Sequence, residues 1–286
     1  MVKIKQELTA DFNWQVPVVV ASLSEGKGAE ALFEAHVEDA DKRFKENKYL
    51  KRASYNPETI IGSNVFLAGH FNELVAPLEL RTVVPSDDVN GDIARLVKDR
   101  FYTDFNALVV RSEQDSYEIN NGLLRQVIET AEQKQGKAKF PFMVEGFHVA
   151  PSEDKEYGMK IVPASNFRVI EDERLDEKKY KTGTKFDKVD EFGLPIFDKS
   201  GNRNWYAKDD GLSWLILDRY LDLDSSDDCL AYSGGSGRVV LVHGGATRAK
   251  IDEFYRARAN EIKARIARAT DIIDKAYEEA LVELKK

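Results

Sequence analysis

The stretch NALVVRSEQDSYEINNGLLRQVIETAEQ, residues 106–133, decides the predicted fold, because a strand pattern is followed there directly by a helix pattern. Four of its first six residues are apolar and two of them are β-branched valines, which is typical of a buried strand. Ser112 and Asp115 then have the spacing of a helix capping box. Apolar residues follow at helical spacing. The stretch therefore predicts a strand and then a helix that begins near Ser112 and ends near Gln133.

Strand and helix patterns also alternate on the N-terminal side of this stretch. The run VPVVVASL is β-branched like the first, and the segment after it has apolar residues on one helical face. Alternation over residues 14–135 predicts an α/β layer, in which parallel strands are one possible arrangement. The predicted strands are residues 16–23, 64–68 and 78–84, and the predicted helices are residues 29–44 and 92–101.

The pattern changes after Lys137, where strand-like runs are separated by closely spaced turns. Clusters of Gly, Asp, Asn and Ser mark turns at residues 191–193, 198–202 and 209–211. Turns at this spacing favour an antiparallel meander. The predicted strands of this part include residues 140–149, 159–162, 167–170, 214–217 and 239–243.

The C-terminal segment, from about Thr247 to Lys286, contains neither Pro nor Gly and predicts one long helix. Its apolar residues recur in alternating steps of four and three, which is the heptad seam of a coiled coil. Such a helix is roughly 60 Å long, whereas a globule of this chain length is about 40 Å across. We therefore expect the helix to pair with another helix. The seam residues are Tyr255, Ala259, Ile262, Ile266, Ala269, Ile273, Ala276 and Ala280, of which all but Ala259 are the expected interface residues.

Together these patterns predict an α+β fold with an N-terminal alternating α/β layer, a C-terminal β-rich meander and a long terminal α-helix. The predicted boundaries place the α/β region at residues 1–136, the β-rich region at residues 137–245 and the long helix at residues 246–286.

Composition and charge argue against several classes of protein. The 286 residues carry a net charge of -8, which argues against a protein that coats duplex nucleic acid. The single cysteine, Cys229, cannot form an intrachain disulfide. There is no apolar signal segment at the N-terminus and no apolar run long enough to span a membrane. We therefore expect a cytoplasmic protein, or a component of a particle assembled inside a cell, without a membrane partner.

Four residues near predicted strand ends form a candidate site for an anionic small molecule. Lys27 lies in a glycine-containing loop before a helix, His70 follows a predicted strand, and Arg111 and Ser112 open the next helix. Backbone N–H groups at helix starts and arginine side chains bind phosphates and carboxylates. The loop at residues 24–28 matches neither the P-loop nor the dinucleotide fingerprint. Helix capping and ion pairing are the simpler interpretation of these residues.

An acidic segment gives a second candidate, a site for Ca²⁺ or Mg²⁺ formed by Asp222, Asp224 and Asp228. The spacing imitates the start of a calcium-binding loop, but Asp227 stands where glycine is needed and Ser233 where a bidentate glutamate is needed. A solvated polar loop between two strands is the competing interpretation.

Aromatic residues gather in the same part of the chain. Such a group can stack against bases or sugars, or it can form the core of a small twisted sheet. The neighbouring acids argue against nucleic acid as the ligand. The residues are Trp205, Tyr206, Trp214, Tyr220 and Tyr232.

The sequence holds no complete catalytic constellation and predicts no cofactor. The leading hypothesis is a non-enzymatic structural or interaction protein that self-associates, or joins a larger assembly, through its long C-terminal helix. Its expected partner is a second copy or another protein. The alternative is an enzyme acting on a phosphorylated or carboxylate small molecule at the strand ends of the N-terminal α/β region. Nucleic-acid contact through the basic first half of the last helix is a third interpretation, although such charges are commonly a solvated face.

Overall fold

The computed structural model describes residues 26–45, 47–56, 59–87, 90–153, 156–176 and 184–243, together with residues 260, 263 and 264. The chain divides into two compact units, residues 1–244 and 245–286. The predicted strand at residues 16–23 and the seam residues Tyr255 to Ala280 lie outside the described residues. Pairing through that seam therefore stays a prediction.

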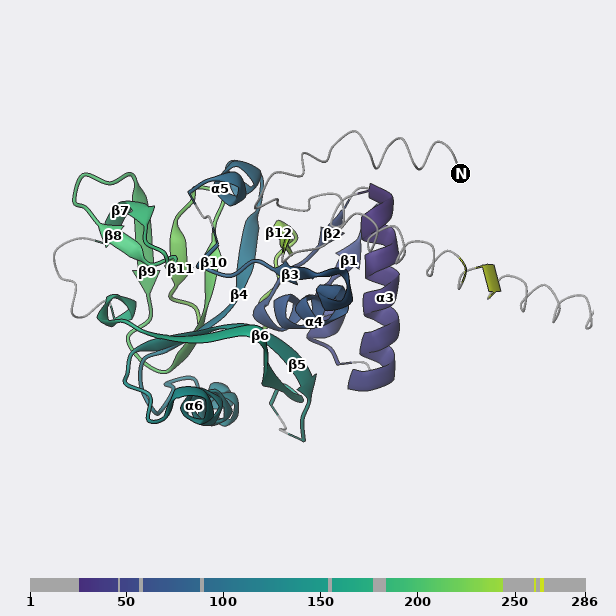
Figure 1. The fold of residues 1–286 in the computed structure, drawn as a ribbon, viewed down its shortest axis with the longest axis horizontal. Coiled ribbons are helices and arrows are strands. Elements are labelled where there is room, and N and C mark those ends of the chain that lie inside the picture. The colour runs from purple at the N-terminus through teal and green to yellow at the C-terminus, as the bar shows by residue number, and fades with distance from the viewer. Residues whose placement is uncertain are drawn as a thin grey trace, which may run out of the picture. The chain divides into compact units, whose positions relative to one another are not determined.

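The described part contains both helices and strands, which confirms an α+β fold (Figure 1). The α-helices are α3 (Gly26–Phe44), α4 (Val65–Val75), α5 (Asp92–Val97) and α6 (Asn121–Gln135), and short 3₁₀ turns are η1 (Leu50–Arg52), η2 (Ala76–Leu78), η3 (Glu118–Asn120) and η4 (Glu173–Leu175). The strands are β1 (Ser54–Tyr55), β2 (Ile60–Ile61), β3 (Leu80–Thr82), β4 (Tyr102–Val110), β5 (Phe142–Pro151), β6 (Met159–Glu171), β7 (Lys185–Val189), β8 (Pro195–Phe197), β9 (Arg203–Ala207), β10 (Leu212–Leu217), β11 (Leu223–Ser225), β12 (Gly237–Arg238) and β13 (Leu241–His243).

The predicted strand at residues 64–68 is wrong, because this segment begins helix α4. Asn64 is the N-cap, and its side chain accepts a hydrogen bond from the Leu67 backbone N–H at 2.9 Å. Residues 65–72 are all buried, so this part of α4 is buried on every side. A short apolar run of this kind cannot be distinguished from a buried strand by periodicity.

Helix α6 is confirmed, but it begins at Asn121 rather than near Ser112. The two predicted capping residues have other partners. The Ser112 hydroxyl donates to the Gln114 carbonyl at 2.7 Å, and Asp115 accepts from the Tyr117 backbone N–H at 2.8 Å. Residues 112–117 therefore form a loop between β4 and α6.

Nine of the described strands form one sheet with the order β6-β5-β4-β10-β11-β9-β7-β8, and β12 pairs with β4. β4 is antiparallel to β5 and β10, although the alternating pattern allowed parallel neighbours. Parallel pairing occurs between β11 and β9 and between β12 and β4. Strands from both sides of residue 136 share this sheet, so the predicted boundary there does not separate two sheets.

β6 is one continuous strand where two were predicted, at residues 159–162 and 167–170. Pro163 lies inside it, opposite Phe147 of β5. β6 is the last strand at its end of the sheet, and a proline is tolerated there because one side of the strand needs no ladder hydrogen bond. The Gln126 side chain of α6 exchanges two hydrogen bonds with the Ile161 backbone, which occupies part of this edge.

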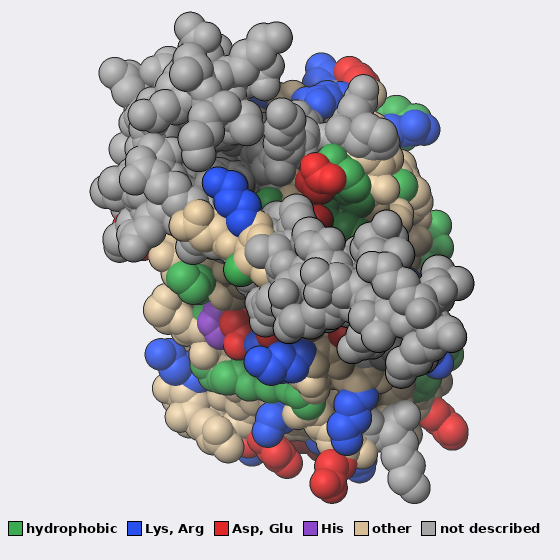
Figure 2. Space-filling model, turned by 90° about the vertical axis from the view of Figure 1, so that its right-hand side faces the viewer, with side chains coloured by type: hydrophobic (Ala, Val, Ile, Leu, Met, Phe, Trp, Pro, Cys, Tyr) green, Lys and Arg blue, Asp and Glu red, His purple; other side chains and the backbone are tan. Residues whose placement is uncertain are grey.

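Helix α4 packs against β3, β4 and β5, and α3 packs against α4. Gly69 permits the close approach of α4 to the sheet, because a Cβ there would lie 2.9 Å from the Val149 side chain. On the face of the molecule shown in Figure 2, acidic and basic side chains are intermixed.

Candidate functional site

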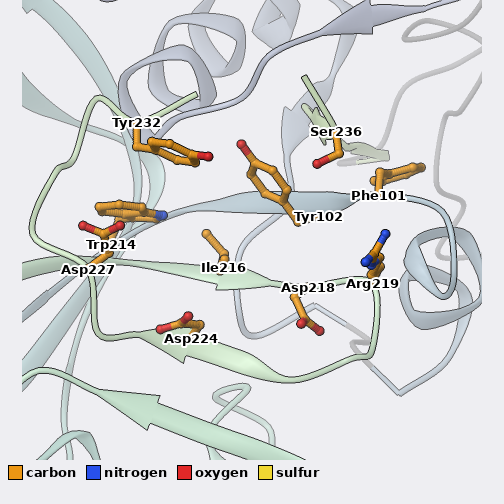
Figure 3. A pocket seen from close by; sticks show the side chains of 10 residues that line it. All are labelled: Phe101, Tyr102, Trp214, Ile216, Asp218, Arg219, Asp224, Asp227, Tyr232 and Ser236. Carbon is orange, nitrogen blue, oxygen red and sulfur yellow. The ribbon is translucent and has the colours of Figure 1, made fainter. Parts of the chain in front are cut away.

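A pocket of about 520 Å³ lies where β4, β10 and β11 meet (Figure 3). β10 contributes Trp214 and Ile216, while the turn after β10 contributes Asp218 and Arg219. Aromatic and acidic side chains from segments that are distant in the sequence share this pocket. The lining residues are Phe101, Tyr102, Trp214, Ile216, Asp218, Arg219, Asp224, Asp227, Tyr232 and Ser236.

Strand register determines which side chains form the floor of the pocket, the face of the sheet that the pocket lies on. Ile216 of β10 lies opposite Asp224 of β11 on one side and opposite Asp104 of β4 on the other. Directly opposed residues in a sheet have side chains on the same face, and so do residues two apart on one strand. Asp224, Ile216, Asp104 and Tyr102 therefore share one face of the sheet.

The segment between β11 and β12 closes another side of the pocket. The Gly234 backbone N–H donates to the Tyr102 hydroxyl at 2.7 Å. A Cβ at Gly237 would lie 2.7 Å from the Tyr102 ring, so a residue without a side chain is needed where β12 pairs with β4. This packing explains the glycines at residues 234 and 237 and holds Tyr232 and Ser236 near Tyr102.

Three carboxylates line the pocket, and each uses one oxygen in a local turn. Oδ1 of Asp218 accepts from two backbone N–H groups, Oδ1 of Asp224 accepts from Ser226, and Oδ1 of Asp227 accepts from the Cys229 N–H. Within the described residues, Oδ2 of each has no hydrogen-bond partner. Burial raises the pKa of Asp218, and the neighbouring charges of Asp222 and Asp224 raise it further.

The aromatic side chains differ in exposure. Trp214 is buried and lines the pocket with one edge, whereas Tyr232 is 53% exposed. Burial and the nearby Asp104 raise the pKa of Tyr102, so its hydroxyl stays protonated and its ring uncharged near neutral pH. In Figure 3 the rings of Trp214, Tyr102 and Tyr232 lie on one side of Ile216, and Asp224 and Asp218 lie on the other.

Asp104 is fully buried beside the pocket floor. Neither of its oxygens has a hydrogen-bond partner among the described residues. Burial raises the pKa of Asp104 to about 7. This carboxyl lies opposite Ile216 and shares the face of the sheet that carries Ile216 and Tyr102.

Of the four residues predicted to bind an anion, His70, Arg111 and Ser112 do not line this pocket. Lys27 lies in the first turn of α3, and Ser112 lies in the loop after β4. His70 is buried in α4 and bonds His36 and Asp39. The buried Arg111 guanidinium donates to the Leu175 carbonyl and to the hydroxyls of two serines in β10 and β11. His70 and Arg111 thus both bond protein groups.

The three predicted cation ligands are not brought together. Asp222 accepts from the backbone and side chain of Asn204, Asp224 lines the pocket, and Asp228 pairs with Lys208 at 3.4 Å. Within the described residues, no group of three His, Cys, Asp or Glu side chains is arranged to hold a metal ion. The competing interpretation of a polar loop with local hydrogen bonds therefore fits this segment.

Sequence reasoning found the acidic group and the aromatic group of residues 205–232 separately but did not combine them. It missed Phe101 and Tyr102 at the start of β4. A usable signal was present, because acids and aromatics alternate closely in the segment WLILDRYLDLDSSDDCLAY, residues 214–232.

Comparison with protein-family models, with curated proteins and with solved structures gives no match for this chain. None of the helices in the described part of the chain is both long and apolar enough to cross a membrane.

Proposed function

We propose that this chain is a non-enzymatic interaction protein and that the pocket between β4, β10 and β11 binds a cationic group carried by its partner. The observation that carries the proposal is the joint lining by Trp214, Tyr102 and Tyr232 with three carboxylates. Aromatic faces attract ammonium and guanidinium groups electrostatically, and recognition of quaternary ammonium ligands uses such rings.

The charge of the lining also favours a cation. Among the residues that the structure describes, Asp218, Asp224 and Asp227 each keep one oxygen without a hydrogen-bond partner, and Arg219 is the single cation in the lining. The Arg219 guanidinium lies 4.9 Å from the Tyr220 ring centroid and donates to the Tyr220 hydroxyl at 2.9 Å. It is thus held against an exposed tyrosine that does not line the pocket.

Choline is expected to bind this pocket about tenfold more tightly than its neutral isostere 3,3-dimethylbutan-1-ol. The two molecules have nearly the same shape, so the difference reports the attraction of the cation to rings and carboxylates, about 1.4 kcal/mol. Titration of the full chain, followed by the indole N–H resonance of Trp214, measures both affinities. Equal affinities for the two molecules would contradict the proposal that the pocket binds a cationic group.

The matched variants are Tyr232→Ala and Tyr206→Ala. Both tyrosines are exposed, but only Tyr232 lines the pocket. Loss of one ring is expected to weaken choline binding about fivefold, because an exposed cation–π contact contributes about 1 kcal/mol. Tyr206→Ala should leave the affinity unchanged. Similar losses in both variants would place choline elsewhere.

Choline affinity is also expected to fall as the pH is lowered from 7 to 5. The pKa of Asp218 is raised, so this carboxylate takes up its proton at a higher pH than an ordinary aspartate. Protonation removes one negative charge from the lining, so the dissociation constant should rise as the pH is lowered. The measurement is the Trp214 titration repeated across this pH range.

Asp218→Asn is the informative variant for this pH dependence, since the amide oxygen can still accept the two backbone N–H groups. It should bind choline more weakly at pH 7 and show a flatter profile below. Asp198→Asn, at an exposed aspartate outside the lining, should keep the wild-type profile. A wild-type profile in Asp218→Asn would assign the pH dependence to another group.

Self-association through the C-terminal seam is a separate prediction, and the pocket proposal does not depend on it. The cationic partner can be another protein or a second copy, and the choline experiment tests only the chemistry of the pocket.

A further inference from the structure

Two histidines and one aspartate form a hydrogen-bonded chain between α3 and α4, away from the pocket. Nδ1 of His36 lies 2.8 Å from Nδ1 of His70, and Nε2 of His70 lies 2.8 Å from Oδ2 of Asp39. At the other end, Nε2 of His36 lies 3.0 Å from the Leu50 carbonyl oxygen. Both imidazole rings are buried.

The number of protons in this chain follows from its two ends. The Leu50 carbonyl and the Asp39 carboxylate are acceptors, so Nε2 of each histidine must carry a proton. The two facing Nδ1 atoms need one proton between them. Three hydrogen bonds therefore require three ring protons, whereas two neutral imidazoles carry only two.

We infer that His36 and His70 share one extra proton, and that this buried cation, paired with Asp39, forms a pH-sensitive clasp between α3 and α4. Loss of the proton removes the hydrogen bond between the two rings or the one to Asp39. Gain of a second proton places two donors against each other at the Nδ1 contact. Both changes weaken the attachment of α3.

The surroundings favour the extra proton on His70. Burial, followed by the charge of His70, lowers the pKa of His36 to about 3. Burial of Asp39 opposes its ionisation, but the hydrogen bond from His70 and the charges of His70 and Arg43 outweigh it, so the pKa of Asp39 is lowered. The Asp39 carboxylate is thus available to pair with a protonated His70.

The charged side chains around the clasp are paired with side chains of opposite charge. Arg43 of α3 bridges Asp39 at 3.1 Å and Glu73 of α4 at 2.9 Å. His148 of β5 interacts with Glu73 and Arg43, and burial lowers its pKa, so it stays neutral near neutral pH. Lys51 of η1 pairs with Asp41 at 3.9 Å.

Aromatic rings enclose the two histidines. Phe71 stacks on His36 with ring centroids 4.9 Å apart, and Phe44 meets His70 edge-on at 5.3 Å.

The proposed clasp contributes most to stability near pH 6.5. Beyond the one proton that each neutral imidazole carries, two unfolded histidines bind one extra proton in total at about pH 6.5, two at lower pH and none at higher pH. While its three hydrogen bonds are intact, the folded pair holds one extra proton. Above pH 6.5 the folded state therefore binds more protons than the unfolded state, and the pair's contribution to stability falls as the pH rises. Below pH 6.5 the unfolded state binds more, and the contribution falls as the pH drops. Each arm approaches about a tenfold change in the unfolding equilibrium constant per pH unit.

Nitrogen-15 labelling of histidine in the full chain tests the proton count directly. At pH 7.5 we expect three protonated ring nitrogens in His36 and His70 together, with both nitrogens of His70 protonated. The chain has four histidines, so the variants His148→Gln and His243→Gln assign the remaining two. Two protonated nitrogens in the pair would overturn the proposal, and this measurement needs no variant of the clasp itself.

Denaturant unfolding between pH 6.5 and 8.5 tests the linkage. Wild type should lose stability relative to His36→Gln/His70→Gln, by up to about tenfold in the equilibrium constant per pH unit. His148→Gln, which keeps the clasp, should follow wild type over this range. Parallel profiles for wild type and the double variant would contradict a proton held by the folded pair.

Discussion

Replacing Gly193 by alanine is expected to lower the free energy of unfolding by about 4 kcal/mol. Gly193 has a φ of +74°, and a Cβ there would lie 1.8 Å from the Pro85 carbonyl oxygen. That oxygen belongs to the backbone of another segment and cannot rotate away as a side chain can. The substitution therefore combines a left-handed backbone with a steric clash. Urea unfolding, with the slope of the transition compared between variants, measures the loss.

Two other glycines separate these causes. Gly136 also has a positive φ, of +87°, but nothing lies within 4 Å of its added Cβ. Its ψ of −162° places it in a region that is essentially restricted to glycine, so Gly136→Ala should cost only the backbone term, about 1–3 kcal/mol. Gly235 has neither a positive φ nor a neighbour, so Gly235→Ala should change stability by less than about 0.5 kcal/mol. If Gly193→Ala and Gly136→Ala cost the same, the contact with Pro85 does not constrain the fold.

The turn at Gly193 could be predicted from the sequence, but its tertiary contact could not. The turn at residues 191–193 was predicted because glycine, proline and polar residues punctuate local structure. The contact with Pro85 was not, since no local pattern encodes which distant backbone approaches the turn. Helices α6 and α4 differ in the same way. The helical spacing of α6 is a local pattern and was predicted, whereas the burial of α4 on every side comes from its contacts with the sheet and α3, which no local pattern encodes.

The candidate pocket was only partly predictable for a related reason. Acids and aromatics of residues 214–232 are visible in the sequence, but their meaning depends on β10 pairing with β4 and on β12 lying beside Tyr102. Strand order and register are tertiary properties, and a shift of one residue would turn Ile216 to the other face. The predicted cation site also depended on an unseen neighbour, because Lys208 pairs with Asp228.

Asp115→Ala is expected to cost about 3–5 kcal/mol of stability. The Asp115 side chain has no solvent exposure and accepts from the Lys208 ammonium at 2.6 Å, from the Tyr117 N–H at 2.8 Å and from the Leu212 N–H. Lys208 is itself only 9% exposed. Alanine would leave this ammonium nearly buried with its closest counter-ion removed. Urea unfolding of the variant and of wild type at pH 7 measures the difference.

Asp228→Ala is the matched control, because it removes the second carboxylate of the same lysine. Asp228 lies 3.4 Å from Lys208 and is 38% exposed, so solvent already screens this pair, and its loss should cost less than about 1 kcal/mol. Equal losses in the two variants would contradict the dominant role of Asp115. The double variant Asp115→Ala/Lys208→Met then identifies the source of the cost. Recovery of most of the stability assigns it to the unpaired charge, whereas no recovery assigns it to the two backbone N–H groups that lose their acceptor.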